Sequence, residues 1–176
     1  GEPVLIPFTA PDYYGNWLEG IVRGLWAAGV RPGDVAHPAY GFTPFIGLAG
    51  AYDALEHLIG ALVIPGGAWD TKTRLAMIPK LGINVLLGTP TYLLYLGRSA
   101  QEAGIDPKSF GIKIVFCTGE PGPMSVPSTR ARLEELWGCP ARDYCGTQET
   151  EYFAWECDAG HAHLNEDLVL FEVLDP

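Results

Sequence analysis

The chain has few basic residues, no long apolar run and no close pairing of cysteines, and each shortage excludes a class of protein. Lysine and arginine number 11 against 21 aspartates and glutamates, which gives a net charge of −10. Nucleic-acid backbones and anionic membrane surfaces are bound by clustered lysine and arginine, so the sequence predicts neither partner. No apolar run approaches the ~20 residues that span a bilayer, and residues 1–3 lack the features of a signal peptide. We therefore expect a cytoplasmic protein.

The spacing of the cysteines is not that of a disulfide framework. Small secreted domains concentrate many cysteines in a short chain, whereas this chain of 176 residues contains 4. Reduced thiols, a metal ligand and core packing remain as interpretations. The four residues are Cys117, Cys139, Cys145 and Cys157.

A candidate metal site involves Cys157, His161 and His163, which share one short segment, and Cys139, which precedes them. Thiolates and imidazoles are the usual ligands of tetrahedral zinc, which needs four. These residues could therefore hold a structural zinc ion. The alternative is that the histidines are ordinary loop residues and that the thiol is buried.

Short runs rich in valine, isoleucine and leucine alternate with amphipathic segments. Continuous apolar runs are typical of strands covered on both faces, and their alternation with helices predicts an α/β fold with a mostly parallel sheet and flanking helices. The 48% of hydrophobic residues is enough for one substantial core. The expected strands are Asp34–Pro38, Ala61–Pro65, Asn84–Gly88 and Ile112–Thr118, and the expected helices cover about 13–29, 48–60, 71–80, 91–104 and 126–137.

The pattern changes after Glu149. Side chains of residues 167–173 alternate as they would on the two faces of a strand, with Leu168 and Leu170 on one face and Val169 and Phe171 on the other. We therefore expect a short C-terminal part that is more antiparallel, with a strand at 167–173.

Polar residues follow two of the apolar runs, at Thr118–Pro121 and at Asp143–Glu149. In each segment a glycine allows a tight turn, and polar groups or a carboxylate lie next to it. Loops at the ends of neighbouring parallel strands converge, so the two segments could hold one nucleotide and its metal. The alternative is that both are ordinary turns that bind nothing.

Several motifs in a fixed order resemble phenylacetate–coenzyme A ligases, which belong to the acyl-adenylate-forming superfamily. They are Tyr40-Gly41-Phe42, 60–67, 89–93, 119–121, 146–149, 166–167 and 172–176. The resemblance covers nearly the whole chain and implies that residues 1–176 are the central part of the large AMP-binding domain. Gly1-Glu2-Pro3 resembles the tail of the phosphate loop, and the rest of that loop and the small C-terminal domain are expected outside this chain.

The resemblance implies a two-step reaction that uses ATP, magnesium and coenzyme A. A small carboxylic acid attacks the α-phosphate of ATP to give an acyl-adenylate, and the thiol of coenzyme A then displaces AMP. We expect an AMP-forming acid–thiol ligase for an aryl or other apolar acid, and the fragment alone is expected to be inactive. A non-catalytic nucleotide-binding or scaffold module derived from such a ligase is the alternative. The sequence neither requires nor excludes a homodimer.

The resemblance also implies roles for the residues of the two polar segments. Glu149 corresponds to the glutamate that holds magnesium, and Gln148 could donate a hydrogen bond to phosphate or to the substrate carboxylate. Two positions depart from the family, because Cys145 replaces an aromatic residue and Gln148 replaces a hydroxyl residue. The residues expected around the nucleotide are Gly119, Glu120, Pro121, Asp143, Tyr144, Cys145, Gly146 and Thr147.

The acyl pocket implied by the resemblance is mostly apolar, as pockets for small molecules usually are. Aromatic side chains and two strand ends supply its wall, and an aryl acid would fit such a wall. The alternative is that the aromatic residues are part of the core. The expected pocket residues are Tyr40, Gly41, Phe42, Phe45, Thr89 and Pro90.

Overall fold

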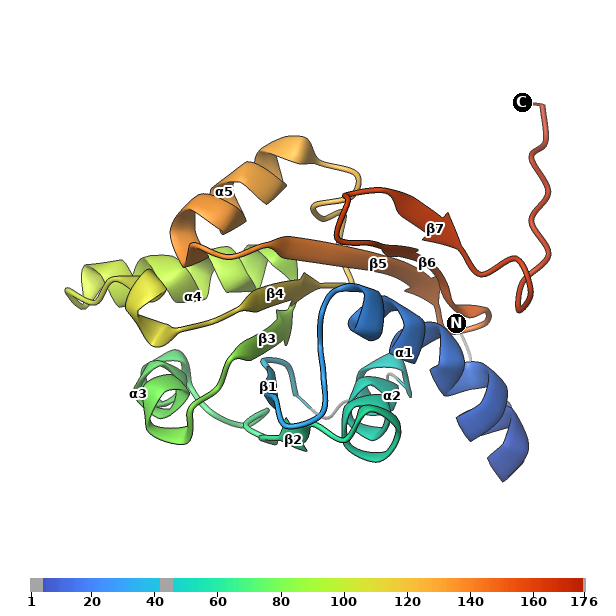
Figure 1. Ribbon diagram of the computed structural model, residues 1–176, viewed down its shortest axis with the longest axis horizontal. Helices are drawn as coiled ribbons and strands as arrows, with labels where there is room; N and C mark the ends of the chain where they lie inside the picture. The colour runs from blue at the N-terminus through green and yellow to red at the C-terminus, as the bar shows by residue number, and fades with distance from the viewer. Residues whose placement is uncertain (1–4, 42–45, 176) are drawn as a thin grey trace.

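The computed structural model of the chain describes residues 5–41 and 46–175, and within them one sheet has the strand order β2-β1-β3-β4-β5-β6-β7 (Figure 1). The pairs from β2 to β5 are parallel, and β5–β6 and β6–β7 are antiparallel. The predicted α/β class, with a more antiparallel C-terminal part, is therefore confirmed. The strands are β1 (Val35–Pro38), β2 (Leu62–Val63), β3 (Val85–Gly88), β4 (Ile114–Cys117), β5 (Ala141–Thr147), β6 (Glu151–Glu156) and β7 (Ala162–Leu164).

Helices cover both faces of the sheet, and two separate cores result. On one face lie η1 (Asp12–Trp17), α1 (Leu18–Ala27), α2 (Ile46–Asp53) and η2 (Ala54–Ile59). On the other lie α3 (Thr71–Leu81), α4 (Pro90–Glu102), η3 (Pro107–Phe110) and α5 (Pro127–Trp137) (Figure 1). Among the described residues, no helix has the length and apolar character needed to cross a membrane.

The central strands are buried on both faces, as their continuous apolar sequences predicted. In β3, Val85 and Leu87 enter the core beneath α1 and α2, whereas Leu86 enters the core beneath α3, α4 and α5. All three side chains are fully buried. Successive side chains of a strand point to opposite faces, so a strand covered on both sides needs apolar residues at every position.

Helix ends follow the local chemistry of the sequence. Asp70 precedes α3 and accepts a hydrogen bond from Thr73 N at 2.7 Å, which satisfies an N–H of the first turn. Pro127 occupies the first turn of α5, and Gly138 ends that helix with φ of 70°. The bounds of α5 agree with the helix expected at about 126–137.

The strand predicted at 167–173 is wrong. Residues 166–169 form a turn in which Leu168 N and Val169 N both donate to Asn165 O. Leu170 and Val173 are almost fully exposed, and residues 167–173 pair with no strand that the structure describes. The antiparallel strands are instead β6 and β7.

Asn165 fixes this C-terminal part to the rest of the sheet. It is buried, and its Nδ2 donates to Tyr152 O at 2.6 Å while its Oδ1 accepts from Trp155 Nε1 at 3.0 Å. Helix α1 packs closely over the same strand, because a Cβ at Gly20 would lie 2.7 Å from Tyr152 O. These long-range contacts place β6 against β5.

Candidate functional site

A cavity of about 940 Å³ opens where the parallel strands end, between the segments that follow β1, β3 and β4 and the C-terminal half of β5. In open parallel sheets this edge is the usual place for a ligand. The wall is mainly apolar, with a few polar groups among the lining residues. They are Tyr40, Gly47, Thr89, Thr118, Gly119, Glu120, Pro121, Gly122, Met124, Ser125, Asp143, Tyr144, Cys145, Gly146, Thr147, Gln148 and Tyr152.

Two glycines, Gly119 and Gly122, allow the loop after β4 to lie close to β5. Gly119 has φ of 79°, a conformation that side chains rarely adopt. Gly122 lies against Asp143, where a Cβ would come within 2.6 Å of Oδ2. Met124 N donates to the same oxygen at 3.2 Å. The Asp143 carboxyl therefore connects this loop to the strand beside it.

Arg130 connects the same loop to β5 and β6. Its Nη2 donates to Pro123 O at 2.9 Å and its Nη1 donates to Ala141 O at 3.0 Å. The guanidinium also forms an ion pair with Glu156, whose side chain is 1% exposed. One side chain therefore connects the loop, the start of β5 and the end of β6.

Asp143 is the most perturbed acid of the cavity. Burial raises its pKa to about 6, and the nearby Glu156 carboxylate acts in the same direction, although hydrogen bonds from Met124 N and Tyr144 N oppose the change. Cys145 also lines the cavity, and burial raises the pKa of its thiol, with the Asp143 charge adding to the effect. A protonated thiol is a poor nucleophile, so Cys145 is better suited to contact than to covalent chemistry.

Two tyrosines connect the strand β5 to helix α2 at the inner wall. Tyr144 donates from its hydroxyl to the Tyr152 hydroxyl at 3.0 Å, and Tyr152 donates to Gly47 O at 2.8 Å. The Tyr144 ring packs on Phe116 with centroids 4.7 Å apart. Tyr144 is thus largely a wall residue that belongs to the core, whereas the neighbouring Cys145 is exposed.

Glu120 contacts the first turn of α4. Its carboxylate accepts from Thr91 Oγ1 at 2.8 Å and from Thr91 N at 3.2 Å. Thr89, which caps α4 by accepting from Tyr92 N, lines the cavity nearby. The loop after β4 is therefore joined to the start of α4 by hydrogen bonds to the Glu120 side chain.

The structure brings together most of the residues singled out from the sequence. The cavity lining includes residues 143–147 and Gln148, the loop 119–121, Tyr40 and Thr89. Gly41, Pro90 and Glu149 are described but are not part of the lining. Phe42 and Phe45 lie outside the described residues. Glu149 is exposed in the turn between β5 and β6, next to Gln148.

Sequence reasoning missed Gly122, Met124, Ser125 and Tyr152 as lining residues. The first three continue the loop after Pro121, so extending the predicted segment as far as the helix would have included them. Tyr152 comes from the antiparallel strand β6, which was not predicted, and no signal in the sequence marked it.

The structure does not show the predicted zinc site. Among the described residues, no group of three or more His, Cys, Asp or Glu is placed to hold a metal ion. His163 stacks on Trp155 with centroids 4.5 Å apart, whereas Cys139 is buried in the core beneath α4 and α5. Cys157, His161 and His163 lie on one hairpin, as their closeness in the sequence indicated. Their side chains do not form a metal-binding group with Cys139.

Comparison with known sequences gives a consistent set of relatives. No protein-family model matches the chain. It is 30% identical over 149 residues to the phenylacetate-coenzyme A ligase of Aromatoleum evansii, a match that covers 85% of this chain and 33% of that protein. It is 28% identical over 180 residues to the phenylacetate-coenzyme A ligase of Thermus thermophilus, which covers 100% of this chain and 39% of that protein. The chain thus spans roughly a third of the length of these relatives.

Solved structures agree with the sequence relatives. A crystal structure of 2-hydroxyisobutyryl-CoA ligase in complex with 2-HIB-AMP and CoA matches with a TM-score of 0.80 and 28% identity, over 90% of this chain and 34% of that one. The fold of the chain is thus that of about a third of a solved acyl-CoA ligase. Within that class, the sequence of the chain is similar to the phenylacetate-coenzyme A ligases along nearly all of its length.

Proposed function

We propose that the cavity binds an acyl-adenylate, and that the chain is the central part of the large domain of an enzyme that joins a carboxylic acid to coenzyme A. The observation that carries the proposal is the convergence of two segments, 118–125 and 143–148, on one mainly apolar cavity at the ends of parallel strands. Similarity to phenylacetate-coenzyme A ligases supports the same chemistry.

In this proposal the adenine lies against the loop after β4. The backbone of Gly119 and Gly122 allows a flat base to approach closely, because neither residue carries a side chain. Asp143 lines the same part of the cavity, and its carboxyl could accept a hydrogen bond from the adenine amino group. Cys145 takes the place of the aromatic residue of the family, so the base has a small thiol on that side.

The acid lies against the wall formed by Tyr40, Thr89 and Tyr152. This wall is mainly apolar, and a pocket of this character favours an aryl or other apolar acid. Helix α2 closes the wall, and the hydrogen bond from Tyr152 to Gly47 O fixes its position.

Glu149 fits the role of magnesium ligand. Its carboxylate is exposed and carries hard oxygen donors next to Gln148 at the cavity. Magnesium is commonly held by one or two carboxylates and the phosphates of the substrate, so one protein carboxylate is sufficient. When bound, magnesium would offset the charge of the phosphates and so reduce their repulsion of the incoming carboxylate.

Two displacements make up the reaction. A carboxylate oxygen attacks the α-phosphorus and pyrophosphate leaves; the thiol of coenzyme A then attacks the acyl carbonyl and AMP leaves. The residues of this chain would hold the two anions in line and exclude water, which lowers the barrier mainly through positioning. Gln148 would donate its amide N–H to the phosphate or the carboxylate.

The experiment that tests the activity uses the complete protein that contains this chain. A panel of aryl and short acyl acids is assayed with ATP and coenzyme A, and we expect AMP and a thioester to form with at least one aryl acid. Replacing Glu149 by Gln should lower the rate at least 100-fold, because magnesium loses its carboxylate. Nucleotide binding without turnover of any acid would instead favour the non-catalytic module.

The isolated chain of residues 1–176 provides a second test. We expect it to bind adenosine nucleotides but not to catalyse carboxylate-dependent exchange of pyrophosphate into ATP. Robust exchange by the chain alone would contradict its assignment as a partial domain. The homodimer remains a prediction, and size-exclusion chromatography with light scattering would test it.

A further inference from the structure

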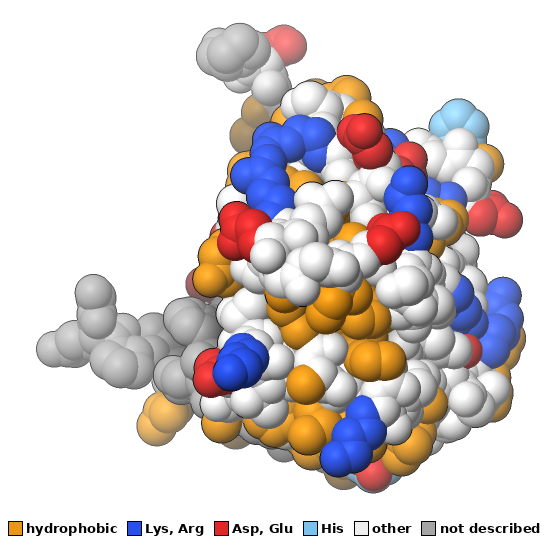
Figure 2. All heavy atoms as spheres, turned by 90° about the vertical axis from the view of Figure 1, so that its left-hand side faces the viewer, with side chains coloured by type: hydrophobic (Ala, Val, Ile, Leu, Met, Phe, Trp, Pro, Cys, Tyr) orange, Lys and Arg blue, Asp and Glu red, His pale blue; other side chains and the backbone are white. Residues whose placement is uncertain are grey.

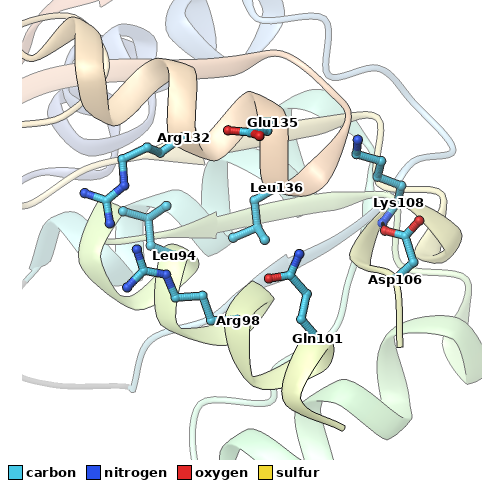
Figure 3. Close-up of a pocket in the computed structure, with 8 residues that line it drawn as sticks. All are labelled: Leu94, Arg98, Gln101, Asp106, Lys108, Arg132, Glu135 and Leu136. Atoms are coloured by element: carbon cyan, nitrogen blue, oxygen red, sulfur yellow. Dashed lines mark hydrogen bonds between the residues drawn. The ribbon is translucent and has the colours of Figure 1, made fainter. Parts of the chain in front are cut away.

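A second hollow, of about 540 Å³, lies between α4, η3 and α5 and shares no lining residue with the cavity at the strand ends. Leu94 and Leu136 form its apolar floor, and charged or polar side chains surround them (Figure 3). Figure 2 looks onto this end of the molecule, and basic side chains lie on its upper part, where Figure 1 places α4 and α5. No role in acid activation requires this hollow.

Rigid elements build the hollow. Leu94, Arg98 and Gln101 are spaced four and three residues apart, so they share one face of α4. Helices α4 and α5 approach closely at Gly97, where a Cβ would lie 2.5 Å from Leu136 Cδ2. The absence of a side chain at Gly97 allows this approach. Trp137 Nε1 donates to Leu93 O at 3.1 Å and joins the two helices further. The side chains around the rim are therefore held by helices rather than by loops.

The basic residues of the hollow are unusual in this acidic chain. Arg98, Lys108 and Arg132 form no ion pair or side-chain hydrogen bond with any residue that the structure describes, a property they share with Lys72 and Lys80. The other basic side chains all bond to described residues: Arg23, Arg31, Arg74, Lys113, Arg130 and Arg142. Three of the five basic side chains without such a partner among the described residues thus line this one hollow.

The arrangement of the rim has two ends. Arg98 and Arg132 lie together at one end, whereas Lys108 and Asp106 lie at the other, with Gln101 pointing between them (Figure 3). Asp106 Oδ1 accepts from Lys108 N at 3.1 Å and so caps η3. The stem of Lys108 lies over Gly138 at the end of α5, where helix carbonyls favour a cation. Lys108 therefore has a structural role, whereas no such role is assigned to the guanidiniums of Arg98 and Arg132.

We propose that this hollow binds a small phosphorylated molecule that carries hydroxyl groups. Two planar guanidiniums match the oxygens of a phosphate, which they can bond in pairs. Gln101 and the carboxylate of Glu135 supply partners for the hydroxyls, and the apolar floor receives the carbon skeleton. The volume lies within the range of sites for small ligands. The site is independent of the reaction proposed above.

Ribose 5-phosphate is a suitable probe, because it has a phosphate and hydroxyls but no adenine for the other cavity to recognise. Titration into the ¹⁵N-labelled chain, followed by NMR, should give saturable shifts at residues 94–108 and 132–138. Ribose should give none, and inorganic phosphate should bind more weakly than ribose 5-phosphate. Raising the salt concentration should weaken binding, since the contact is between exposed charges.

The double variant Arg98→Gln/Arg132→Gln should raise the dissociation constant at least tenfold. The matched control is Lys72→Gln/Lys80→Gln, which removes the same charge elsewhere and should change binding by less than twofold. Arg132→Lys keeps the charge but loses the planar fork, so it should give an intermediate loss even if the double variant unfolds. Equal losses in the two double variants, shifts confined to 118–125 and 143–148, or no saturable shift would each overturn the proposal.

Discussion

The two hollows of this molecule are built in opposite ways. The cavity at the strand ends is lined by the loop after β4 and by the C-terminal half of β5, has a mainly apolar wall and places backbone and a buried carboxyl next to its ligand space. The hollow between α4 and α5 is lined by helical side chains that are mostly charged and exposed. Loops need anchors to hold a shape, whereas helices hold their side chains through their own packing. The loop cavity should therefore be the more sensitive to changes at positions that fasten it.

The largest effect is expected at Arg130, which connects the loop after β4 to β5 and β6. Arg130→Ala leaves the buried Glu156 carboxylate without its partner, and breaking a buried ion pair in this way costs about 3 kcal/mol. Urea unfolding measures the loss. The double variant Arg130→Leu/Glu156→Leu should regain much of the stability, because no uncompensated charge remains. A double variant as unstable as Arg130→Ala would show that the ion pair is not the reason.

A smaller effect on stability, but a specific one on binding, is expected at Gly122. Gly122→Ala places a methyl group against the Asp143 carboxyl, so the loop must move, at a cost of about 2 kcal/mol. Binding of AMP, measured by calorimetry, should weaken at least tenfold, whereas binding of ribose 5-phosphate at α4 and α5 should not change. Gly15→Ala is the matched control, because a Cβ there meets nothing within 4 Å. If the variant weakened the binding of AMP and of ribose 5-phosphate equally, or weakened neither, the contrast between the two hollows would be removed.

A third effect concerns the pH dependence of stability. Because the pKa of Asp143 is raised to about 6 in the folded protein, the folded state binds more protons than the unfolded state between about pH 4 and pH 6. This residue's contribution to stability is therefore present below about pH 4 and is lost as the pH rises through 6, by about 3 kcal/mol in total. Asp143→Asn should remove this part of the pH dependence in urea unfolding. An unchanged pH profile in the variant would mean that other groups cause it.

The sequence predicted the central part of the fold well because its signals there are local. Val85, Leu86 and Leu87 are apolar at every position since both faces of β3 are covered. The polar segments after β4 and β5 meet because parallel strands end at one edge. Such features require no knowledge of distant contacts.

The C-terminal part was predicted poorly because distant contacts determine it. Strand β6 is placed by Asn165, by the close approach of α1 at Gly20 and by Tyr152, whose hydroxyl reaches Gly47. Residues 167–173 have the alternation of a strand but no partner to pair with. The zinc site stays a prediction for a related reason, since spacing along the chain does not give the distance between Cys139 and the hairpin.

The most direct test of the central claim is the position at which an acyl-adenylate binds. A non-hydrolysable acyl-sulfamoyl adenosine, titrated into the ¹⁵N-labelled chain, should shift the amides of 118–125, 143–148 and 152 together with a single dissociation constant, and should leave 94–108 unchanged. Gly122→Ala should raise this dissociation constant at least tenfold. Shifts confined to the helices, or no binding to the folded chain, would contradict the assignment of the cavity at the strand ends as the adenylate site.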